Sequence, residues 1–321
     1  MGRGLRRRWV LGVLAATVSA VPALGQSKAS LTLLTARPGS LYERAGQAFR
    51  KVLQPQGFDV VVKESPGSMF NLEQLAQGKA DLALAQMDAF VLFKQQHTPR
   101  RARVDNLTVI GPVNEELVHL LVRPGIRSLG QLRGKRIGVG PQDSGTYVSA
   151  LLVLQMADLD VTRERLVTGE IRQGVRELQA GQLDALFVTA GIGAPQLQAI
   201  PAGAPVELLA LDQALLNQAK NNFPEAAALY QLRSLPARTY PWQSRPVTTL
   251  ATYSYLFARR SLPQALVYRL TQTLARHQQA LRQAHPFWAL LTLDRRQETF
   301  AAGLTYHPGV QQYLNEQKVP R

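Results

Sequence analysis

The chain has 321 residues, of which 45% are hydrophobic and 18% charged, with a formal net charge of +15 and no cysteine. This length and apolar content suffice for about two packed domains, which argues against disorder. The lack of cysteine excludes disulfides, thiol catalysis and thiolate metal sites. A basic excess can steer an anionic solute or bind nucleic acid or a membrane surface, but the Arg residues are scattered and lack a recognition motif, so we predict no nucleic-acid partner.

Residues 1–25 have the pattern of a secretory signal peptide. Four Arg lie within residues 3–8, an apolar run covers residues 10–24, and small residues precede a cleavage point before Gln26. The run is short and contains Pro22, which disfavours a membrane anchor. The pair Arg7-Arg8 leaves Sec and twin-arginine export both open. We therefore predict an exported protein in a periplasm-like space.

Strands and helices alternate after the predicted leader. Residues 31–34, 60–62 and 80–86 have the composition of buried strands, and residues 41–53 and 87–95 have the pattern of helices. The alternation predicts an α/β protein with open, mostly parallel sheets, in which ligands lie outside the carboxyl ends of the strands. The candidate ligand-binding residues at these ends are Ser40, Tyr42, Ser68, Asn71 and Gln86.

A second strand, turn and helix follow in the middle of the chain. Residues 107–110 and 117–122 are predicted as two strands, and the chain then enters a strand at 136–140 and a helix that begins near Ser144-Gly145-Thr146. The start of a helix offers unpaired N–H groups and the positive end of a dipole, which suits a carboxylate. The alternative is that Ser144 or Thr146 only caps the helix.

The two halves share a repeated pattern. Residues 39–42 align with 144–147, and residues 75–86 align with 178–189. Each longer copy has a Gly at a helix end, an Asp, and an apolar strand that ends on Gln86 or Thr189, so the repeat predicts two lobes of like construction. Thr189 and Gly191 join the candidate residues. The equivalent Asp81 and Asp184 favour turn formation over proton transfer.

The remaining sequence completes the domain assignment. Residues 235–242 are predicted as a surface loop, residues 247–257 as a returning strand, and the C-terminal part as helical with Ser261 as a cap. We assign 1–25 to the signal peptide, 26–120 to the first part of lobe 1 and 121–246 to lobe 2. Residues 247–321 form the return crossing and the helices that complete lobe 1 and the hinge.

No motif of a known catalytic or metal site is present. Gly140 stands four residues before Ser144, so there is no Gly-x-Ser-x-Gly elbow, and Gly138-Val-Gly140 lacks the third glycine of a dinucleotide loop. The five His have no metal-ligand spacing, and we expect His119 to be a packed or capping residue. The sequence thus predicts no catalysis, no cofactor and no metal, with an enzyme on the same fold as the alternative.

Five segments in this order and spacing resemble a known family: 39–42, 67–88, 129–140, 143–146 and 184–187. The chain resembles a solute-binding subunit of the TAXI branch of the tripartite ATP-independent periplasmic (TRAP) transporters. The resemblance implies a type II-like periplasmic-binding-protein fold, whose two lobes close over a small organic anion such as glutamate, a related amino acid or a dicarboxylate. It also implies a monomer that delivers its solute to a sodium-coupled membrane permease.

Seven candidate residues match the motifs of this family by position: Tyr42, Ser68, Asn71, Gln86, Ser144, Gly145 and Thr146. The first loop departs from the glycine-rich pattern of the family because it contains Ala36-Arg37-Pro38. Arg37 either adds a charge for an acidic solute or stiffens a different loop together with Pro38. A module that senses a solute and docks to a receptor is the other reading of the same features.

Overall fold

The computed structural model describes residues 29–97, 101–293 and 303–317. The predicted signal peptide lies outside the described residues. Within them, no helix combines the length and the apolar character that crossing a membrane requires.

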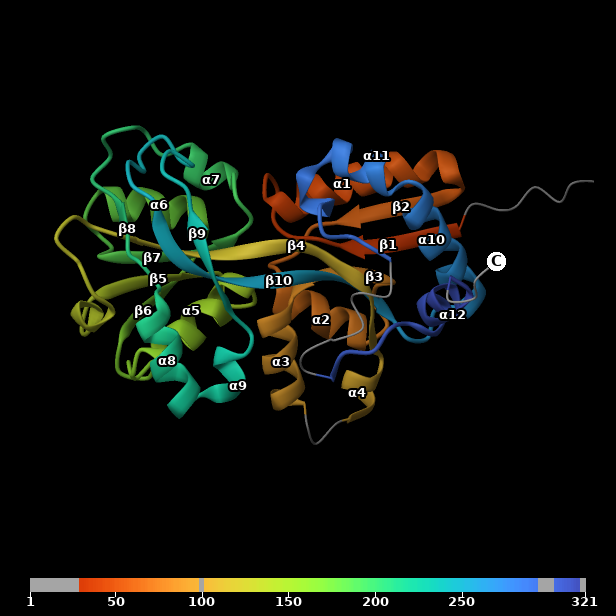
Figure 1. Ribbon diagram of the computed structural model, residues 1–321, viewed down its shortest axis with the longest axis horizontal. Helices are drawn as coiled ribbons and strands as arrows, with labels where there is room; N and C mark the ends of the chain where they lie inside the picture. Colours follow the sequence, from red (N-terminus) through yellow and green to blue (C-terminus); the bar gives the residue numbers. More distant parts are fainter. Residues whose placement is uncertain (1–28, 98–100, 294–302, 318–321) are drawn as a thin grey trace, which may run out of the picture.

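A single ten-stranded sheet runs through both halves of the molecule (Figure 1). Its main order is β2-β1-β3-β10-β4-β7-β5-β6, with β8 beside β4 and β9 beside β10. Three parallel strands form the centre of each half, namely β2-β1-β3 in the first lobe and β7-β5-β6 in the second. The strands are β1 (Ala29–Leu34), β2 (Phe58–Lys63), β3 (Leu82–Gln86), β4 (Leu107–Val122), β5 (Arg136–Gly140), β6 (Arg165–Thr168), β7 (Ala185–Ala190), β8 (Glu207–Leu208), β9 (Gln231–Leu235) and β10 (Val247–Arg259).

Helices cover both faces of the sheet (Figure 1). In the view of Figure 1, α1 and α11 lie above the first lobe and α2, α3 and α4 below it, while α6 and α7 lie above the second lobe and α5, α8 and α9 below it. The α-helices are α1 (Leu41–Leu53), α2 (Ser68–Ala76), α3 (Met87–Gln96), α4 (Arg101–Asp105), α5 (Gly145–Met156), α6 (Ile171–Gln179), α7 (Pro195–Gln198), α8 (Gln213–Asn222), α9 (Pro224–Ala227), α10 (Gln264–Arg276), α11 (Gln278–Ala284) and α12 (Pro308–Glu316). The 3-10 helices are η1 (Gln54–Gln56), η3 (Leu129–Leu132) and η4 (Pro286–Trp288).

The hydrophobic core is continuous on one face of the sheet and divided on the other. Phe90 of α3 and Val153 of α5 belong to the same buried cluster, which spans both lobes. On the opposite face, Phe49 of α1 and Leu178 of α6 belong to two separate clusters. The two lobes are therefore packed together along one side of the sheet and have independent cores on the other.

Two long antiparallel strands connect the lobes. β4 pairs with β10 along residues 107–117 and with β7 along residues 117–122. The sequence predicted two strands here, at residues 107–110 and 117–122. The structure has one continuous strand, and Pro112, which has no N–H to donate, lies where the register between β4 and β10 shifts. The predicted lobe boundary at residue 120 falls inside this strand and remains a prediction.

The repeated Asp residues have the same structural role in both lobes, as predicted. The Asp81 carboxylate accepts the Thr32 N–H of β1 at 2.8 Å, and the Asp184 carboxylate accepts the Arg136 N–H of β5 at 3.0 Å. Each Asp therefore ties the turn before its own strand, β3 or β7, to the neighbouring middle strand of its lobe, β1 or β5. An arginine at the end of a long strand lies beside each carboxylate, Arg259 at Asp81 and Arg123 at Asp184.

Two local predictions were wrong, and a third needs a correction at one residue. The helix caps show that Ser40 corresponds to Ser144, since each side chain accepts the N–H three residues ahead, so the alignment of 39–42 with 144–147 is shifted by one residue. The predicted surface loop is confirmed over residues 236–242, except that Tyr240 is fully buried against the second-lobe core. The helix after β10 begins at Gln264 with Pro263 at its N-cap, so Ser261 does not cap it.

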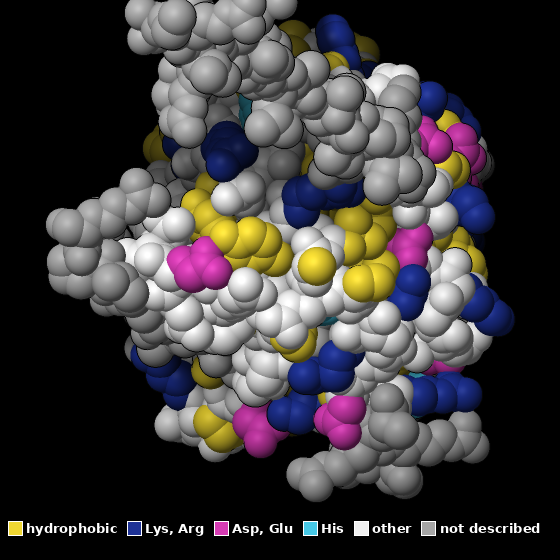
Figure 2. Space-filling model, turned by 90° about the vertical axis from the view of Figure 1, so that its right-hand side faces the viewer, with side chains coloured by type: hydrophobic (Ala, Val, Ile, Leu, Met, Phe, Trp, Pro, Cys, Tyr) yellow, Lys and Arg dark blue, Asp and Glu magenta, His cyan; other side chains and the backbone are white. Residues whose placement is uncertain are grey.

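The positive charge is spread over the outer end of the first lobe. Figure 2 shows Lys and Arg side chains there separated by acidic, apolar and uncharged surface. The net charge of the chain is therefore not gathered into one patch on this face.

Candidate functional site

A cavity of about 410 Å³ lies where the carboxyl ends of the parallel strands of the two lobes face each other. Four segments that lead into helices line it, at the starts of α1, α2, α5 and α6. All four helices thus direct their N-termini toward one space, where partial positive charge favours an anion. The lining residues are 36–38, 40–42, 66–68, 86, 116, 141, 144–146, 170–173, 176, 188–190 and 196.

The N-terminus of α5 presents backbone rather than hydroxyl donors. Ser144 Oγ accepts the Tyr147 N–H at 3.1 Å and donates to the Pro141 carbonyl at 2.6 Å, so it caps the helix. Thr146 Oγ1 accepts the Thr189 N–H at 3.1 Å and donates to the Thr189 carbonyl at 3.5 Å. Both hydroxyls are therefore engaged within the protein, and the first-turn N–H groups of Gly145 and Thr146 are the donors left for a ligand.

Gln86 of the first lobe lies directly against Gly145 of the second. A Cβ added to Gly145 would lie 1.4 Å from Gln86 Oε1 and 2.9 Å from Ser68 Oγ. Ser68 Oγ also accepts the Gln86 N–H at 3.2 Å. Gln86 is 2% exposed, and its Oε1 has no hydrogen-bond partner among the described residues. Only a glycine permits the lobes to approach this closely here.

The structure brings eight of the ten predicted site residues together around the cavity, and their role in binding stays a prediction. These eight are Ser40, Tyr42, Ser68, Gln86, Ser144, Gly145, Thr146 and Thr189. Thr189 Oγ1 is buried and, like Gln86 Oε1, has no partner among the described residues.

Asn71 and Gly191 lie outside the cavity lining. The Asn71 amide donates to the carbonyls of Thr35 at 2.7 Å and Leu84 at 2.8 Å, so it ties together the ends of β1 and β3. Gly191 lines a smaller space of about 210 Å³ instead, where a Cβ would lie 2.7 Å from Asn114 Nδ2. Both residues shape the strand ends behind the cavity.

Charged side chains of both lobes meet at the cavity. Arg37 of the β1–α1 loop forms an ion pair with Glu170 at the start of α6, at 2.8 Å, and each side chain is about half exposed. The Arg172 guanidinium lies beside Gly39, where a Cβ would be 2.8 Å from Nη2, and it has no ion-pair partner among the described residues. The Arg37–Glu170 pair therefore links the lobes, and Arg172 is a cation open to a ligand.

A buried carboxyl group also lines the cavity. Glu116 of β4 is 1% exposed, and its Oε1 accepts hydrogen bonds from Ser254 Oγ at 2.7 Å and Asn114 Nδ2 at 3.2 Å. The Tyr42 hydroxyl is hydrogen-bonded to the same Ser254 at 2.5 Å. Burial raises the pKa of Glu116 to about 7, against the lowering effect of these hydrogen bonds. The group therefore changes its protonation near neutral pH.

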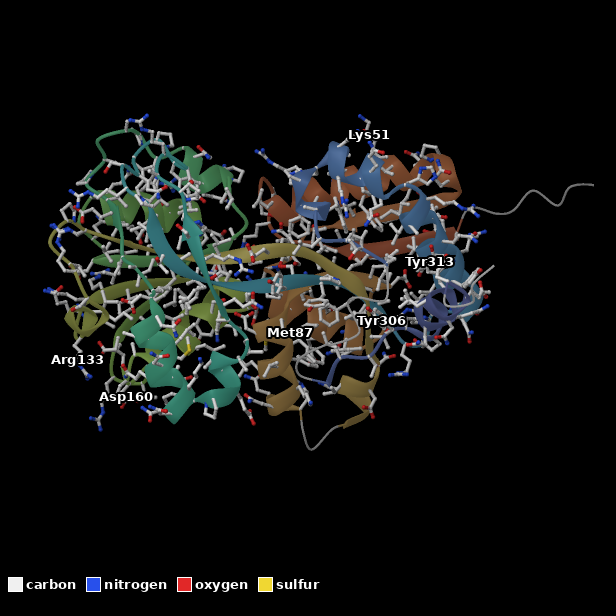
Figure 3. The ribbon with its side chains drawn as sticks, viewed as in Figure 1. Lys51, Met87, Arg133, Asp160, Tyr306 and Tyr313 are labelled. Carbon is white, nitrogen blue, oxygen red and sulfur yellow. The ribbon has the colours of Figure 1, made fainter. Side chains whose placement is uncertain are left out.

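Further contacts join the lobes beside the cavity. The Met69 N–H at the start of α2 donates to the Asp143 carbonyl at 3.1 Å. Asp88 of α3 is fully buried and accepts from Ser149 Oγ of α5 at 2.5 Å and the Tyr230 hydroxyl at 2.8 Å. Burial raises the pKa of Asp88. In Figure 3, Met87, the residue before Asp88, lies in the middle of the molecule where these two halves meet.

Sequence reasoning missed Glu116 and the start of α6, with Glu170, Arg172 and Arg176. The rule that placed the other candidates also applies to α6, because its first turn follows the carboxyl end of β6. Glu116 carried a weaker signal, since it lies at the edge of an apolar run that was predicted as two separate strands.

His119 is a packed residue, as predicted. It is 1% exposed, its Nδ1 lies 3.1 Å from the Val188 carbonyl oxygen, and its Nε2 lies 2.9 Å from the Tyr240 hydroxyl. Burial lowers the pKa of His119 to about 4, so the ring is neutral at pH 7. The part of the chain that the structure describes contains no group of three or more His, Asp or Glu arranged to hold a metal ion.

Solved structures share this architecture. A protein from Bordetella bronchiseptica RB50 superposes with a TM-score of 0.52 at 17% identity, covering 83% of this chain and 78% of that chain. The periplasmic aliphatic sulphonate binding protein SsuA from Escherichia coli gives 0.50 at 16%, covering 89% and 83%. The GluR0 ligand-binding core from Nostoc punctiforme in complex with L-glutamate gives 0.49 at 15%, covering 80% and 98%. The chain has the two-lobed α/β fold of periplasmic binding proteins.

The model of the NMT1-like family matches residues 33–317, which includes nearly the whole described chain. The chain therefore belongs to the NMT1-like family.

Proposed function

We propose that this protein captures a small organic anion between its two lobes and hands it to a membrane permease, without catalysing a reaction. The observation that carries the proposal is the convergence of four helix N-termini on one interlobe cavity. Backbone N–H groups and helix dipoles favour negative charge at such a point. The buried Gln86 Oε1 in the same lining has no hydrogen-bond partner among the described residues. An unsatisfied polar atom of this kind favours a binding site for a polar ligand over a simple packing defect.

The cavity has the size and charge for a small carboxylate. A volume of about 410 Å³ lies within the usual range for small-molecule sites. Three Arg and two Glu line it, and one Arg is neutralised by its Arg37–Glu170 ion pair. The carboxylate would lie at the N–H groups of Gly145 and Thr146, with Arg172 near its second polar end.

The finer assignment is a TAXI-type subunit of a TRAP transporter that binds a glutamate-like amino acid or a dicarboxylate. It follows from the order and spacing of segments 39–42, 67–88, 129–140, 143–146 and 184–187. The same assignment places the mature, monomeric protein in the periplasm after removal of residues 1–25. Its partner would be the membrane-embedded permease of that transporter.

Thermal unfolding of residues 26–321 against amino acids, dicarboxylates, 2-oxo acids, sulfonates, sugars and nucleobases tests the proposal. A ligand at one hundred times its dissociation constant stabilises the folded state by about 2.7 kcal/mol, which shifts the midpoint by several degrees. We expect a shift with small carboxylates and full recovery of the compound by mass spectrometry. Consumption of the compound, or shifts only with uncharged solutes, would contradict the proposal.

A matched pair of variants tests the placement. Arg172→Ala removes one of the two cavity arginines, Arg172 and Arg176, that form no ion pair among the described residues, whereas Arg282→Ala removes an exposed arginine from α11 in the first lobe. We expect weaker binding of the selected carboxylate only for Arg172→Ala, by about three- to tenfold because the group is exposed. Equal affinities for both variants would place the anion elsewhere.

The second candidate function is a solute-sensing module that docks to a receptor after closing. The same cavity serves both functions, so binding data do not separate them. Co-purification of the closed protein with a permease or with a receptor distinguishes the two.

A further inference from the structure

Glu116 differs from every other charged group at the cavity. It is 1% exposed, and no Lys, Arg or His forms an ion pair with it within residues 29–97, 101–293 and 303–317. Its neighbour Glu115, on the opposite face of β4, is paired with Arg233 at 2.6 Å. A carboxyl group that is buried without a cation requires either a proton or a positive charge from a ligand.

The neighbours of Glu116 supply hydrogen bonds but no positive charge. Ser254 of β10 and Asn114 of β4 donate to it, and Tyr42 of α1 reaches it through Ser254. The nearest ionisable group on α3 is Asp88, whose negative charge also raises the pKa of Glu116. The backbone of Gly191 is a further hydrogen-bond neighbour. Among the residues that the structure describes, no cation therefore compensates the charge of Glu116.

The cavity thus has two walls of opposite character. The starts of α1, α5 and α6 offer N–H groups, together with the open Arg172, whereas the Met69 and Phe70 N–H groups of α2 already donate to the Asp143 carbonyl. Glu116 offers a carboxyl oxygen and a negative charge. A dicarboxylate would place a second anion in a space that already contains Glu116. A ligand with an ammonium group next to its carboxylate would instead pair the ammonium with Glu116 and the carboxylate with the N–H groups.

We propose that Glu116 is the specificity-determining residue of this cavity, which selects solutes carrying a protonated amine beside the carboxylate over dicarboxylates of the same skeleton. This inference rests on the proposed capture of a small organic anion and narrows its class to amino acids. The Glu116 carboxylate would accept the ammonium N–H while the helix N-termini hold the carboxylate.

The direction of the pH dependence follows from this assignment. An ammonium ligand binds the ionised form of Glu116, whose pKa lies at about 7. Its affinity should therefore fall as the pH drops below 7, by up to about tenfold per pH unit. A dicarboxylate binds better when Glu116 is protonated, so its affinity should rise over the same interval. Asp88 and Tyr42 are present in all variants below, so the difference between variants isolates Glu116.

Calorimetric titrations with matched ligand pairs test the inference. The pairs are L-glutamate with glutarate, L-aspartate with succinate, L-alanine with propionate, and L-leucine with 4-methylpentanoate, each measured at pH 5.5, 6.5 and 7.5. The proteins are the wild type, Glu116→Gln and the control Glu115→Gln. The wild-type pH profile tests the inference without any substitution, which covers the case in which Glu116→Gln does not fold.

We expect the wild type and Glu115→Gln to bind an amino acid at least about tenfold tighter than its deaminated partner, since a hydrogen bond between charged groups is lost. Glu116→Gln should lose this preference and the pH dependence of amino-acid affinity. Tighter binding of the deaminated acids, or an equal loss for both members of a pair, overturns the role of Glu116 and leaves the proposed function intact. Absence of binding by any carboxylate, in these pairs and in the wider unfolding screen, overturns both.

Discussion

Gly145→Ala tests whether closure of the two lobes accompanies binding. The added Cβ would lie 1.4 Å from Gln86 Oε1, 2.4 Å from Gln86 Cδ and 2.9 Å from Ser68 Oγ, all in the first lobe. Gln86 is 2% exposed, so its amide has little room to move away. Gly145 has no positive φ and begins α5, where alanine is a good helix former. The clash therefore acts between the lobes and not within the second lobe.

The expected effect on affinity follows from the cost of overpacking. Overpacking of this kind costs about 1–3 kcal/mol, which converts to a roughly 5- to 150-fold weaker apparent affinity if the ligand binds the closed form. Calorimetry with the carboxylate selected by the unfolding screen measures it. Small-angle scattering of the ligand-free protein should show a more extended particle.

Gly130→Ala is the matched control, because Gly130 has no positive φ and a Cβ there would meet no atom within 4 Å. Both variants should have similar midpoints of thermal unfolding without ligand. If Gly145→Ala binds as tightly as Gly130→Ala, the close approach of Gln86 and Gly145 is not part of the ligand-bound state, and the reasoning fails.

Three further predictions concern the charged and buried contacts between the lobes. Glu170→Gln removes the half-exposed ion pair with Arg37, so stopped-flow dissociation should be at most about fivefold faster and the difference should vanish at high salt. Glu116→Gln should make the ligand-free protein more stable than the wild type above pH 7. Because burial raises the pKa of Glu116, the contribution of this group to the stability of the folded wild type is fully present below pH 4.5 and is lost as the pH rises through about 7. Measurements of the unfolding midpoint against pH will show this loss. Ser149→Ala removes a donor to the buried Asp88 and should lower the free energy of unfolding in urea by about 1–3 kcal/mol; an unchanged value would mean that this contact is absent in solution.

Local sequence signals predicted the strand–turn–helix units well. The N-caps at Ser40 and Ser144 and the turn carboxylates at Asp81 and Asp184 depend on neighbours a few residues away or on a repeated pattern. Because parallel strands share one carboxyl edge, the same signals placed Gln86 and Thr189 at the cavity.

Long-range pairing decided the parts that were missed. Pro112 interrupts the apolar run locally, but its register shift against β10 keeps β4 continuous, and this places Glu116 at the cavity. Tyr240 lies in a polar, proline-containing segment, yet its hydroxyl lies beside His119, which is 121 residues away.

The sequence by itself determined the α/β class, the repeat of two lobes and the helix starts that line the cavity, because these depend on periodicity, capping and strand ends. Only the tertiary structure decided which groups remain without partners in the cavity. The Asn71 side-chain nitrogen donates to two backbone carbonyls, Ser144 caps its own helix, and Glu116 forms no ion pair with any described residue. Such assignments depend on distances between segments far apart in the chain, and no local pattern encodes them.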